Sequence, residues 1–235
     1  VPRDGSGYSG TSDYFIHYIA YPPDWQAGNV PILDGRNIVP DDPGESTGYN
    51  AGIYIDGANY LHFEGLTIRN YWQKYLRVFV QGLVSVDCKF HTYKNITVHN
   101  ITGRGIYYDP TLGPDTTRFI NCDVYNCCDS LAAPGEEGGW GDGWQAINQK
   151  AAYLLFDGCR AWNNSDDGFN TTPLGLIEIR NCWSFDNGKL NGDGTGYKMN
   201  PDPDQYNSET TYRVHNNISA FNKIGFDENN NGMAT

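Results

Sequence analysis

Acidic side chains gather beside two glycines of the sequence. The stretch NNSDDGFN holds Asp166 and Asp167 directly before a glycine and Asn170 two residues after it, and the segment GDGW places Asp142 directly before another glycine. Carboxylate and amide oxygens are hard ligands that suit Ca²⁺, which accepts roughly six to eight oxygens. For an isolated DDG, a solvated turn in which Asp accepts hydrogen bonds from backbone N–H groups is the simpler interpretation. The choice depends on whether the chain brings the two segments together.

Repeated hexapeptides indicate how distant segments meet. Each begins with Asn or Gly and has apolar or small residues at its second and fourth positions, an alternation typical of a half-buried strand. The repeats are GLTIRN (65–70), NITVHN (95–100), NCDVYN (121–126), GCRAWN (158–163), NCWSFD (181–186) and NISAFN (217–222). Short repeats that bury little surface alone must stack on one another.

A second set of repeats follows the first in a fixed order. Each is a glycine, an inward apolar residue and then an outward residue, although Glu228 breaks the pattern in the last. The set comprises GIYI (52–55), GIYY (105–108), GWQA (143–146), GFNT (168–171), GYKM (196–199) and GFDE (225–228). We therefore predict an all-β chain that folds as one right-handed parallel β-helix domain over 1–235. An antiparallel sandwich is the alternative, but its hairpin signals should dominate the sequence.

Several residues have a structural interpretation in this β-helix. Three of the six cysteines, Cys122, Cys159 and Cys182, occupy the second repeat position, which predicts buried thiols rather than disulfides. The recurring asparagines are expected at a turn, where their amides hydrogen-bond between coils. They are Asn100, Asn126, Asn163 and Asn222. The segments 1–10 and 232–235 lack recognisable caps, so we expect terminal coils to be missing or the chain to be a fragment of a longer one.

Stacking of the coils would turn the repeats into a site. Adjacent strands lie about 4.8 Å apart, so residues in one column are neighbours. Asp142 and Asp167 fall in one column, and we place both in the turn before a strand because strict alternation would point them inward. Three acids and an amide so close would repel one another without a cation. The predicted metal ligands are Asp142, Asp166, Asp167 and Asn170.

The outward column through Asn170 also contains a lysine. It continues upward to Lys198 and Asp227 and downward to Gln145 and Tyr107. Most lysines are simply solvated, but an amine beside a bound dication has a lowered pKa and can act as a base. The combination suggests removal of a proton next to a carboxylate, with Lys198 as the base and the metal stabilising the developing charge.

These segments resemble one known family. GDGW (141–144), CRAWNNSDDGFN (159–170) and NCWSFDNGKLNGDGTGYKMN (181–200) are similar to polysaccharide lyase family 9, the β-helical pectate lyases, and AYPPDWQAGNVPILDG (20–35) resembles an early coil of such enzymes. The resemblance implies a Ca²⁺ site of four acidic residues and a lysine that acts as the Brønsted base. It places three of the acids at Asp142, Asp166 and Asp167 and the base at Lys198. The fourth ligand falls on Asn170, which departs from the family pattern.

The resemblance also implies a reaction and a substrate class. The reaction is β-elimination, in which Lys198 removes H5 of a uronate and the bond to O4 breaks. The implied partner is an acidic polysaccharide such as polygalacturonate or rhamnogalacturonan. We expect the enzyme to be secreted and monomeric, with a signal peptide that is not in this chain. The expected substrate-binding residues are Tyr107, Gln145, Arg104 and Lys189. We expect Trp144 and Tyr197 to point into the core.

Composition excludes some partners, and two other functions remain open. The formal net charge of −12 disfavours nucleic acid, and no apolar run reaches the roughly 18 to 20 residues of a membrane span. A β-helical glycoside hydrolase would use paired carboxylates, but it would leave Lys198 without a role and the Gly-His-Gly of β-helical polygalacturonases is absent. The other alternative is a non-catalytic carbohydrate-binding β-helix stabilised by calcium.

Overall fold

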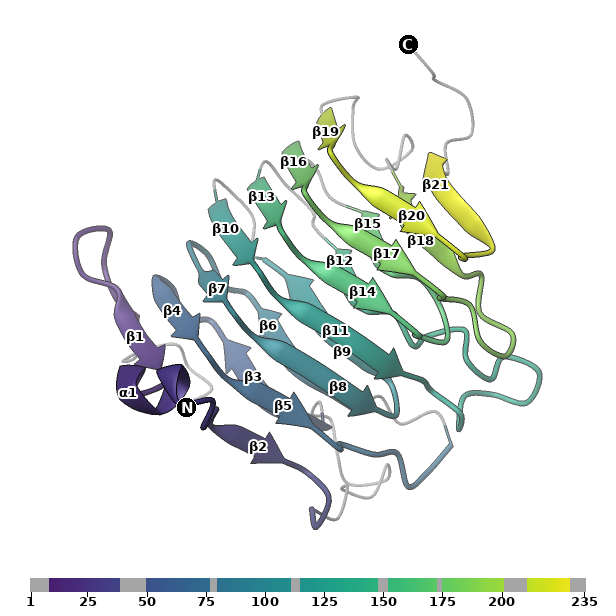
Figure 1. Ribbon diagram of the computed structural model, residues 1–235, viewed down its shortest axis with the longest axis horizontal. Coiled ribbons are helices and arrows are strands. Elements are labelled where there is room, and N and C mark those ends of the chain that lie inside the picture. Colours follow the sequence, from purple (N-terminus) through teal and green to yellow (C-terminus); the bar gives the residue numbers. More distant parts are fainter. Residues whose placement is uncertain are drawn as a thin grey trace.

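The chain coils into three parallel sheets that run the length of the molecule (Figure 1). The computed structural model describes residues 9–38, 50–76, 80–110, 115–147, 152–172, 175–200 and 211–228. Each coil gives one strand to each sheet in the order A, B, C, and every pair of neighbouring strands is parallel. The predicted parallel β-helix is confirmed.

Each sheet has seven strands within the described residues. Sheet A contains β1 (Ile16–Ile19), β4 (Leu61–Glu64), β7 (Thr92–Lys94), β10 (Asp115–Ile120), β13 (Ala152–Asp157), β16 (Gly175–Arg180) and β19 (Thr211–His215). Sheet B contains β2 (Ile32–Asp34), β5 (Thr67–Arg69), β8 (Thr97–Ile101), β11 (Asp123–Cys127), β14 (Arg160–Trp162), β17 (Trp183–Phe185) and β20 (Ile218–Ala220). Sheet C contains β3 (Asn50–Asp56), β6 (Val80–Val86), β9 (Arg104–Asp109), β12 (Trp144–Ile147), β15 (Phe169–Thr172), β18 (Thr195–Met199) and β21 (Ile224–Glu228). The helix α1 (Pro22–Gln26) lies beside the first coil.

Stacked side chains fill the space between the sheets. In sheet C the ring of Trp144 stacks on Phe169 with centroids 4.7 Å apart, and Phe169 stacks on Tyr197 at 5.0 Å. Trp144 and Tyr197 are fully buried, as expected. Cys122, Cys159 and Cys182 are buried free thiols, which confirms their prediction. The fold therefore buries the inward column of each sheet and leaves the outward columns free to form a site.

The turns explain why asparagine and glycine recur in the hexapeptides. The first position has a positive φ in every repeat of sheet B, with Gly65 at 74° and Asn95 at 53°, a conformation that Gly and Asn tolerate best. At the other end of the strands, Asn100, Asn126 and Asn163 also have positive φ. Their amides form a ladder in which each Nδ2 donates to the Oδ1 one coil earlier, at 3.0 Å for Asn126 to Asn100 and 2.6 Å for Asn163 to Asn126.

The alignment of the last hexapeptide is wrong by one residue. Ile218 pairs with Trp183, so the repeat begins at Asn216 rather than Asn217. Asn222 consequently leaves the outer ladder and joins a second, buried one, in which its Oδ1 accepts from Nδ2 of Asn187 at 2.9 Å. Ile218 points outward instead of into the core and is 49% exposed.

Two parts of the repeat architecture were missed in the sequence. Gly82 begins a further member of the glycine set, because Leu83 lies in register between Ile53 and Ile106. The strands of sheet A are the second part that was missed, because no turn residue recurs at a fixed position beside them. The terminal segments for which we expect missing coils lie mostly outside the described residues, and the assignment of 1–235 to one domain stays a prediction.

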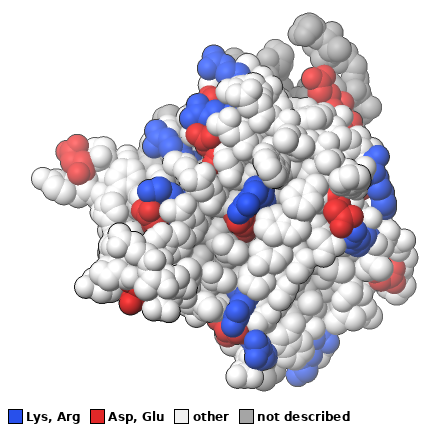
Figure 2. Space-filling model, viewed as in Figure 1, with Lys and Arg blue, Asp and Glu red and all other residues white. Residues whose placement is uncertain are grey.

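The outer face of sheets A and B carries charges of both signs side by side (Figure 2). Ion pairs join neighbouring coils there, with Lys94 Nζ 2.8 Å from Glu64 Oε1 and Arg180 NH2 2.7 Å from Asp157 Oδ2. In both pairs the basic side chain meets an acid of the preceding coil. No helix in the described part of the chain is long and apolar enough to cross a membrane.

The glycine column of sheet C should be intolerant of side chains wherever another coil covers it. A Cβ at Gly105 would collide with Cγ1 of Val124 and lie 2.7 Å from the carbonyl oxygen of Gly143, whereas one at Gly225, in the last described coil, would have its nearest neighbour at 3.6 Å. We expect Gly105→Ala to lower the free energy of unfolding by about 1–3 kcal/mol through overpacking. Gly225→Ala is the matched control, with an expected change within about 0.5 kcal/mol. Urea unfolding measures both, and equal midpoints would contradict the packing argument.

Candidate functional site

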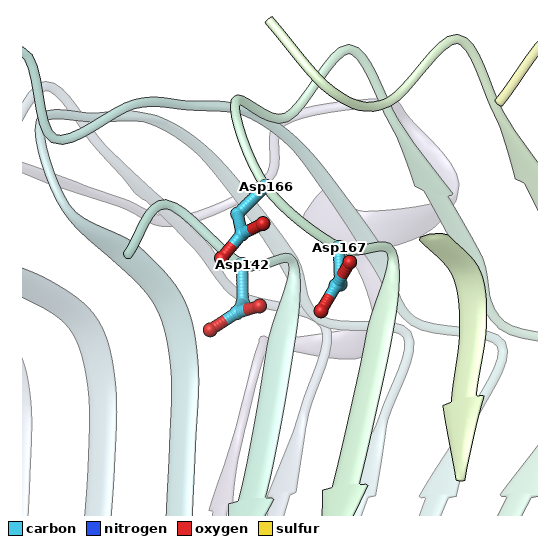
Figure 3. Close-up of side chains that lie close together, drawn as sticks. All are labelled: Asp142, Asp166 and Asp167. Carbon is cyan, nitrogen blue, oxygen red and sulfur yellow. The ribbon is translucent and has the colours of Figure 1, made fainter. Parts of the chain in front are cut away.

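Three carboxylates meet where two coils turn from sheet B into sheet C. Asp142 lies in the turn before β12, and Asp166 and Asp167 lie in the turn before β15. One oxygen of each carboxylate lies within 4.8 Å of one oxygen of each of the others. Figure 3 shows the three side chains facing the same space. The predicted meeting of the two acidic segments, and their place in turns, are confirmed; their role as metal ligands stays a prediction.

Burial and proximity make this cluster costly while its members are charged. The three residues are at most 6% exposed. Burial, followed by repulsion from Asp166 and Asp167, raises the pKa of Asp142 well above its usual range. Burial and the charge of Asp167 raise the pKa of Asp166 to about 7. Backbone N–H groups offset part of the cost, because Asp193 N donates to Asp166 Oδ1 at 2.7 Å and Thr195 N donates to Asp167 Oδ1 at 2.8 Å.

Lys198 lies against the cluster from the next coil. It pairs in register with Asn170, and its Nζ lies 3.2 Å from Asp167 Oδ2 and 2.8 Å from Asp193 Oδ2. Burial lowers the pKa of Lys198, but contacts with Asp193 and Asp167 outweigh burial and leave its pKa above the ordinary value. In the ion-free site the amine is therefore protonated, while a lowered pKa beside a bound dication stays a prediction.

Asn170 lies between the acids and a second amide. Its Nδ2 donates to Asp142 Oδ1 at 3.4 Å, and its Oδ1 accepts from Asn200 Nδ2 at 3.1 Å. An oxygen contact with a cation would require the amide to rotate by half a turn. Oδ1 of Asn200 is buried with no hydrogen-bond partner among the described residues, so a paired rotation of both amides would let Asn170 Nδ2 donate to it.

The predicted substrate-binding residues fall into different environments. Tyr107 and Gln145 lie in the outward column, as predicted, but Tyr107 is only 8% exposed. Oε1 of Gln145 is buried without a hydrogen-bond partner in the described part of the chain. Arg104 is buried beside Asp142, with its Nε 3.9 Å from Asp142 Oδ2. Lys189 pairs instead with Asp186 at 2.6 Å in a loop. Their substrate contacts remain predictions.

Two residues of the site were missed in the sequence. Asp193 provides the shortest contact to the Lys198 amine, and Asn200 orients the amide of Asn170. The signal for Asp193 was present, because the segment GDGTG (192–196) leads directly into GYKM and repeats the acid-beside-glycine pattern of the other two turns. Asn200 lies just beyond β18 and carries no comparable pattern.

The residues present fit a hard divalent cation. The cluster offers only carboxylate oxygens, with an amide beside it, and hard oxygen donors favour Ca²⁺ or Mg²⁺ over softer metals. Three buried carboxylates lie close together, one of them against Lys198, and a dication would replace the repulsion between their charged forms with attraction. No soft cysteine or histidine ligand belongs to this group.

The fold and the site together define a parallel β-helix with a buried acidic cluster and an adjoining lysine. The chain belongs to the family of Pel9A-like right-handed β-helix regions, whose model matches residues 5–235. This match confirms the predicted hand of the β-helix and the resemblance to β-helical pectate lyases.

Individual relatives agree with this assignment. The chain is 30% identical over 191 residues to proteins called Pectate lyase L from Dickeya chrysanthemi and from Dickeya dadantii (strain 3937). The match covers 77% of this chain but only 40% of those proteins. The chain thus spans less than half the length of the curated relatives it matches.

Two solved structures share the fold. Pectate lyase Pel9A superposes with a TM-score of 0.62 at 22% identity, over 92% of this chain and 49% of the other. A structure called Rhamnogalacturonan lyase gives a TM-score of 0.63 at 25% identity, over 93% of this chain and 54% of the other.

In the absence of divalent cations, the acid cluster should make the protein less stable as the pH rises. The unfolded Asp166 carboxyl loses its proton near 3.8, whereas the folded one keeps it until about 7, so raising the pH through this window favours the unfolded chain. We expect the thermal midpoint, measured with a chelator, to fall between pH 4 and pH 7. Asp166→Asn should flatten that slope. Asp186→Asn, which removes an exposed carboxylate, is the control and should leave the slope unchanged. A thermal midpoint that stays constant between pH 4 and pH 7 in the unmutated protein would contradict a destabilising charge in the acid cluster.

Proposed function

We propose that this chain carries the active site of a calcium-dependent polysaccharide lyase that cleaves a uronic-acid polymer by β-elimination. The observation that carries the proposal is the contact of Lys198 Nζ with Asp167 at 3.2 Å, which joins a potential base to the acid cluster. The names of the relatives, pectate lyase and rhamnogalacturonan lyase, support the same reaction class. The proposal includes a secreted, monomeric protein.

The cation would be held by Asp142, Asp166 and Asp167, with the amide oxygen of Asn170 after its rotation. Bound there, calcium would attract the carboxylate of the substrate and stabilise the negative charge that develops beside it. It would also reconcile an acidic protein, of net charge −12, with an acidic polymer.

Lys198 would act as the base. Its neutral amine takes H5 of the uronate, the electrons of the C5–H bond form the C4–C5 double bond, and the C4–O4 bond breaks with its electron pair on the leaving oxygen. The amine must first lose its own proton, which the contacts with Asp193 and Asp167 oppose. Turnover therefore requires the charge of these carboxylates to be engaged elsewhere, and Asp193, whose side chain is 65% exposed, is free to turn away.

The same contacts favour one other function. An amine held between two carboxylates is also suited to a structural role, and Asn170 removes one charge from the family pattern. A calcium-stabilised β-helix that binds polysaccharide without cleaving it is therefore the second candidate. A glycoside hydrolase gains no support, because it gives Lys198 no role.

Loss of the Lys198 amine distinguishes these candidates. We expect the wild-type chain to release unsaturated products from polygalacturonate or rhamnogalacturonan when calcium is supplied, and to release none with a chelator. Lys198→Ala should lower this rate at least about a hundredfold, the usual contribution of a general base, while polymer binding persists. Ultraviolet absorbance of the new double bond measures the product, and Lys94→Ala, on sheet A, is the control lysine. Binding without product from wild type would establish the non-catalytic candidate, and new reducing ends without unsaturation would establish a hydrolase.

Restoring the fourth acid should strengthen calcium binding. Asn170→Asp adds a carboxylate to the cluster, and calcium affinity rises with the number of charged ligands. We expect the calcium dissociation constant to fall roughly tenfold, about 1.4 kcal/mol, and the calcium-free protein to become less stable. Calorimetric titration and thermal unfolding measure the two effects. Asp123→Asn is a control outside the cluster, and an unchanged calcium affinity in Asn170→Asp would exclude position 170 as a ligand.

A further inference from the structure

Two long turns flank the short turn that carries Asp166 and Asp167. They are residues 128–143, between β11 and β12, and residues 186–194, between β17 and β18. The turns are joined to each other, because Asn191 N donates to the carbonyl oxygen of Glu137 at 3.0 Å and Asn191 Nδ2 donates to Glu137 Oε2 at 3.2 Å. Together they form a wall beside the acid cluster.

Trp140 is the large exposed aromatic residue of this wall. It lies two residues before Asp142, and 41% of its surface is accessible. Its backbone N–H donates to Asp129 Oδ1 at 3.1 Å, which fixes the chain at this point. The indole is therefore exposed and held on a fixed backbone beside the cluster of buried acids.

A buried cation lies over one face of this indole. The Arg104 guanidinium carbon is 5.2 Å from the centre of the Trp140 ring and 5.5 Å from that of Tyr107, while its Nε is 3.9 Å from Asp142 Oδ2. The Arg104 side chain is only 8% exposed, so it lies on the protein side of the ring. Because 41% of Trp140 is accessible and Arg104 covers the inner face, the accessible part of the ring lies on the side away from Arg104.

We propose that Trp140 forms a sugar-binding subsite, in which the outer face of its indole stacks on a ring of an anionic polysaccharide next to the acid cluster. The proposal rests on the proposed function only for the class of ligand. An aromatic face offers a large apolar surface to the C–H groups of a pyranose ring. It also carries negative charge density, which would repel a uronate.

Arg104 resolves this conflict of charge. A cation on the inner face draws the electron density of the indole toward itself and places a positive charge within reach of the outer face. The repulsion between the outer face and an acidic sugar is then reduced. Arg104 thus acts on the substrate through the ring of Trp140, which reconciles its burial with a contribution to specificity.

A binding experiment tests the subsite directly. Lys198→Ala is the parent, so that bound oligosaccharide is not cleaved, and oligogalacturonates are titrated by calorimetry at saturating calcium. We expect Trp140→Ala in this parent to weaken binding roughly three- to tenfold, the range of aromatic stacking, and Trp140→Phe to fall between. Trp183→Ala is the matched control, because Trp183 is 49% exposed on β17 of sheet B, and it should bind like the parent.

The outcomes separate the subsite from the proposed function. Unchanged calcium affinity in Trp140→Ala would show that its site is intact, and unsaturated product is assayed in the wild-type background. A Trp140 effect on binding with no product from wild type would overturn the lyase and keep the subsite. Equal binding by Trp140→Ala and the parent, or a parent that binds no oligogalacturonate, would overturn the subsite. Unsaturated product formed with an unchanged KM in Trp140→Ala would also overturn the subsite, while the proposed lyase activity would hold.

Discussion

Adjacent coils are held in register about 4.8 Å apart, and the rest of the structure depends on this spacing. A side chain in one column cannot avoid the same position on the next coil, so each column must hold residues that tolerate one another. Rings meet rings, as when Phe119 stacks on Phe156 at 5.3 Å. Amides meet amides, as when Asn163 donates to Asn126. The same spacing makes a column of like charges costly, because its members cannot separate.

The acid cluster breaks this rule of compatible neighbours. Asp142 and Asp167 share a column, and Asp166 adds a third buried carboxylate. The fold offsets only part of the repulsion, through Lys198, Arg104 and backbone N–H groups. A stable sequence would ordinarily avoid such a conflict, and local violations of this kind are expected where function resides. The cost to the ion-free fold and the proposed affinity for a cation would therefore have one origin.

Register is also what made the site predictable from sequence. Aligning glycines placed Asp142, Asn170 and Lys198 in neighbouring positions before any contact was known, because a parallel stack converts spacing in the chain into distance. The alignment of repeats failed where the turn residues were ambiguous. A pair of asparagines shifted the last repeat by one residue, and the strands of sheet A have no turn residue at a fixed position. The alignment could not place Trp140, because long turns follow no column and their contacts depend on tertiary packing. Asp193 was missed although it lies beside glycines, as the other acids do.

Asn170 shows how the charge of this cluster can be set by a single position. A carboxylate there would add repulsion to three acids that are already buried, and the ion-free fold would carry the whole cost. The amide instead donates to Asp142 at 3.4 Å, so it relieves repulsion when no cation is present. The same amide can offer only a neutral oxygen to a cation, which weakens the attraction. In the proposed calcium site, position 170 would therefore balance ion-free stability against cation affinity, and an amide there favours the ion-free fold.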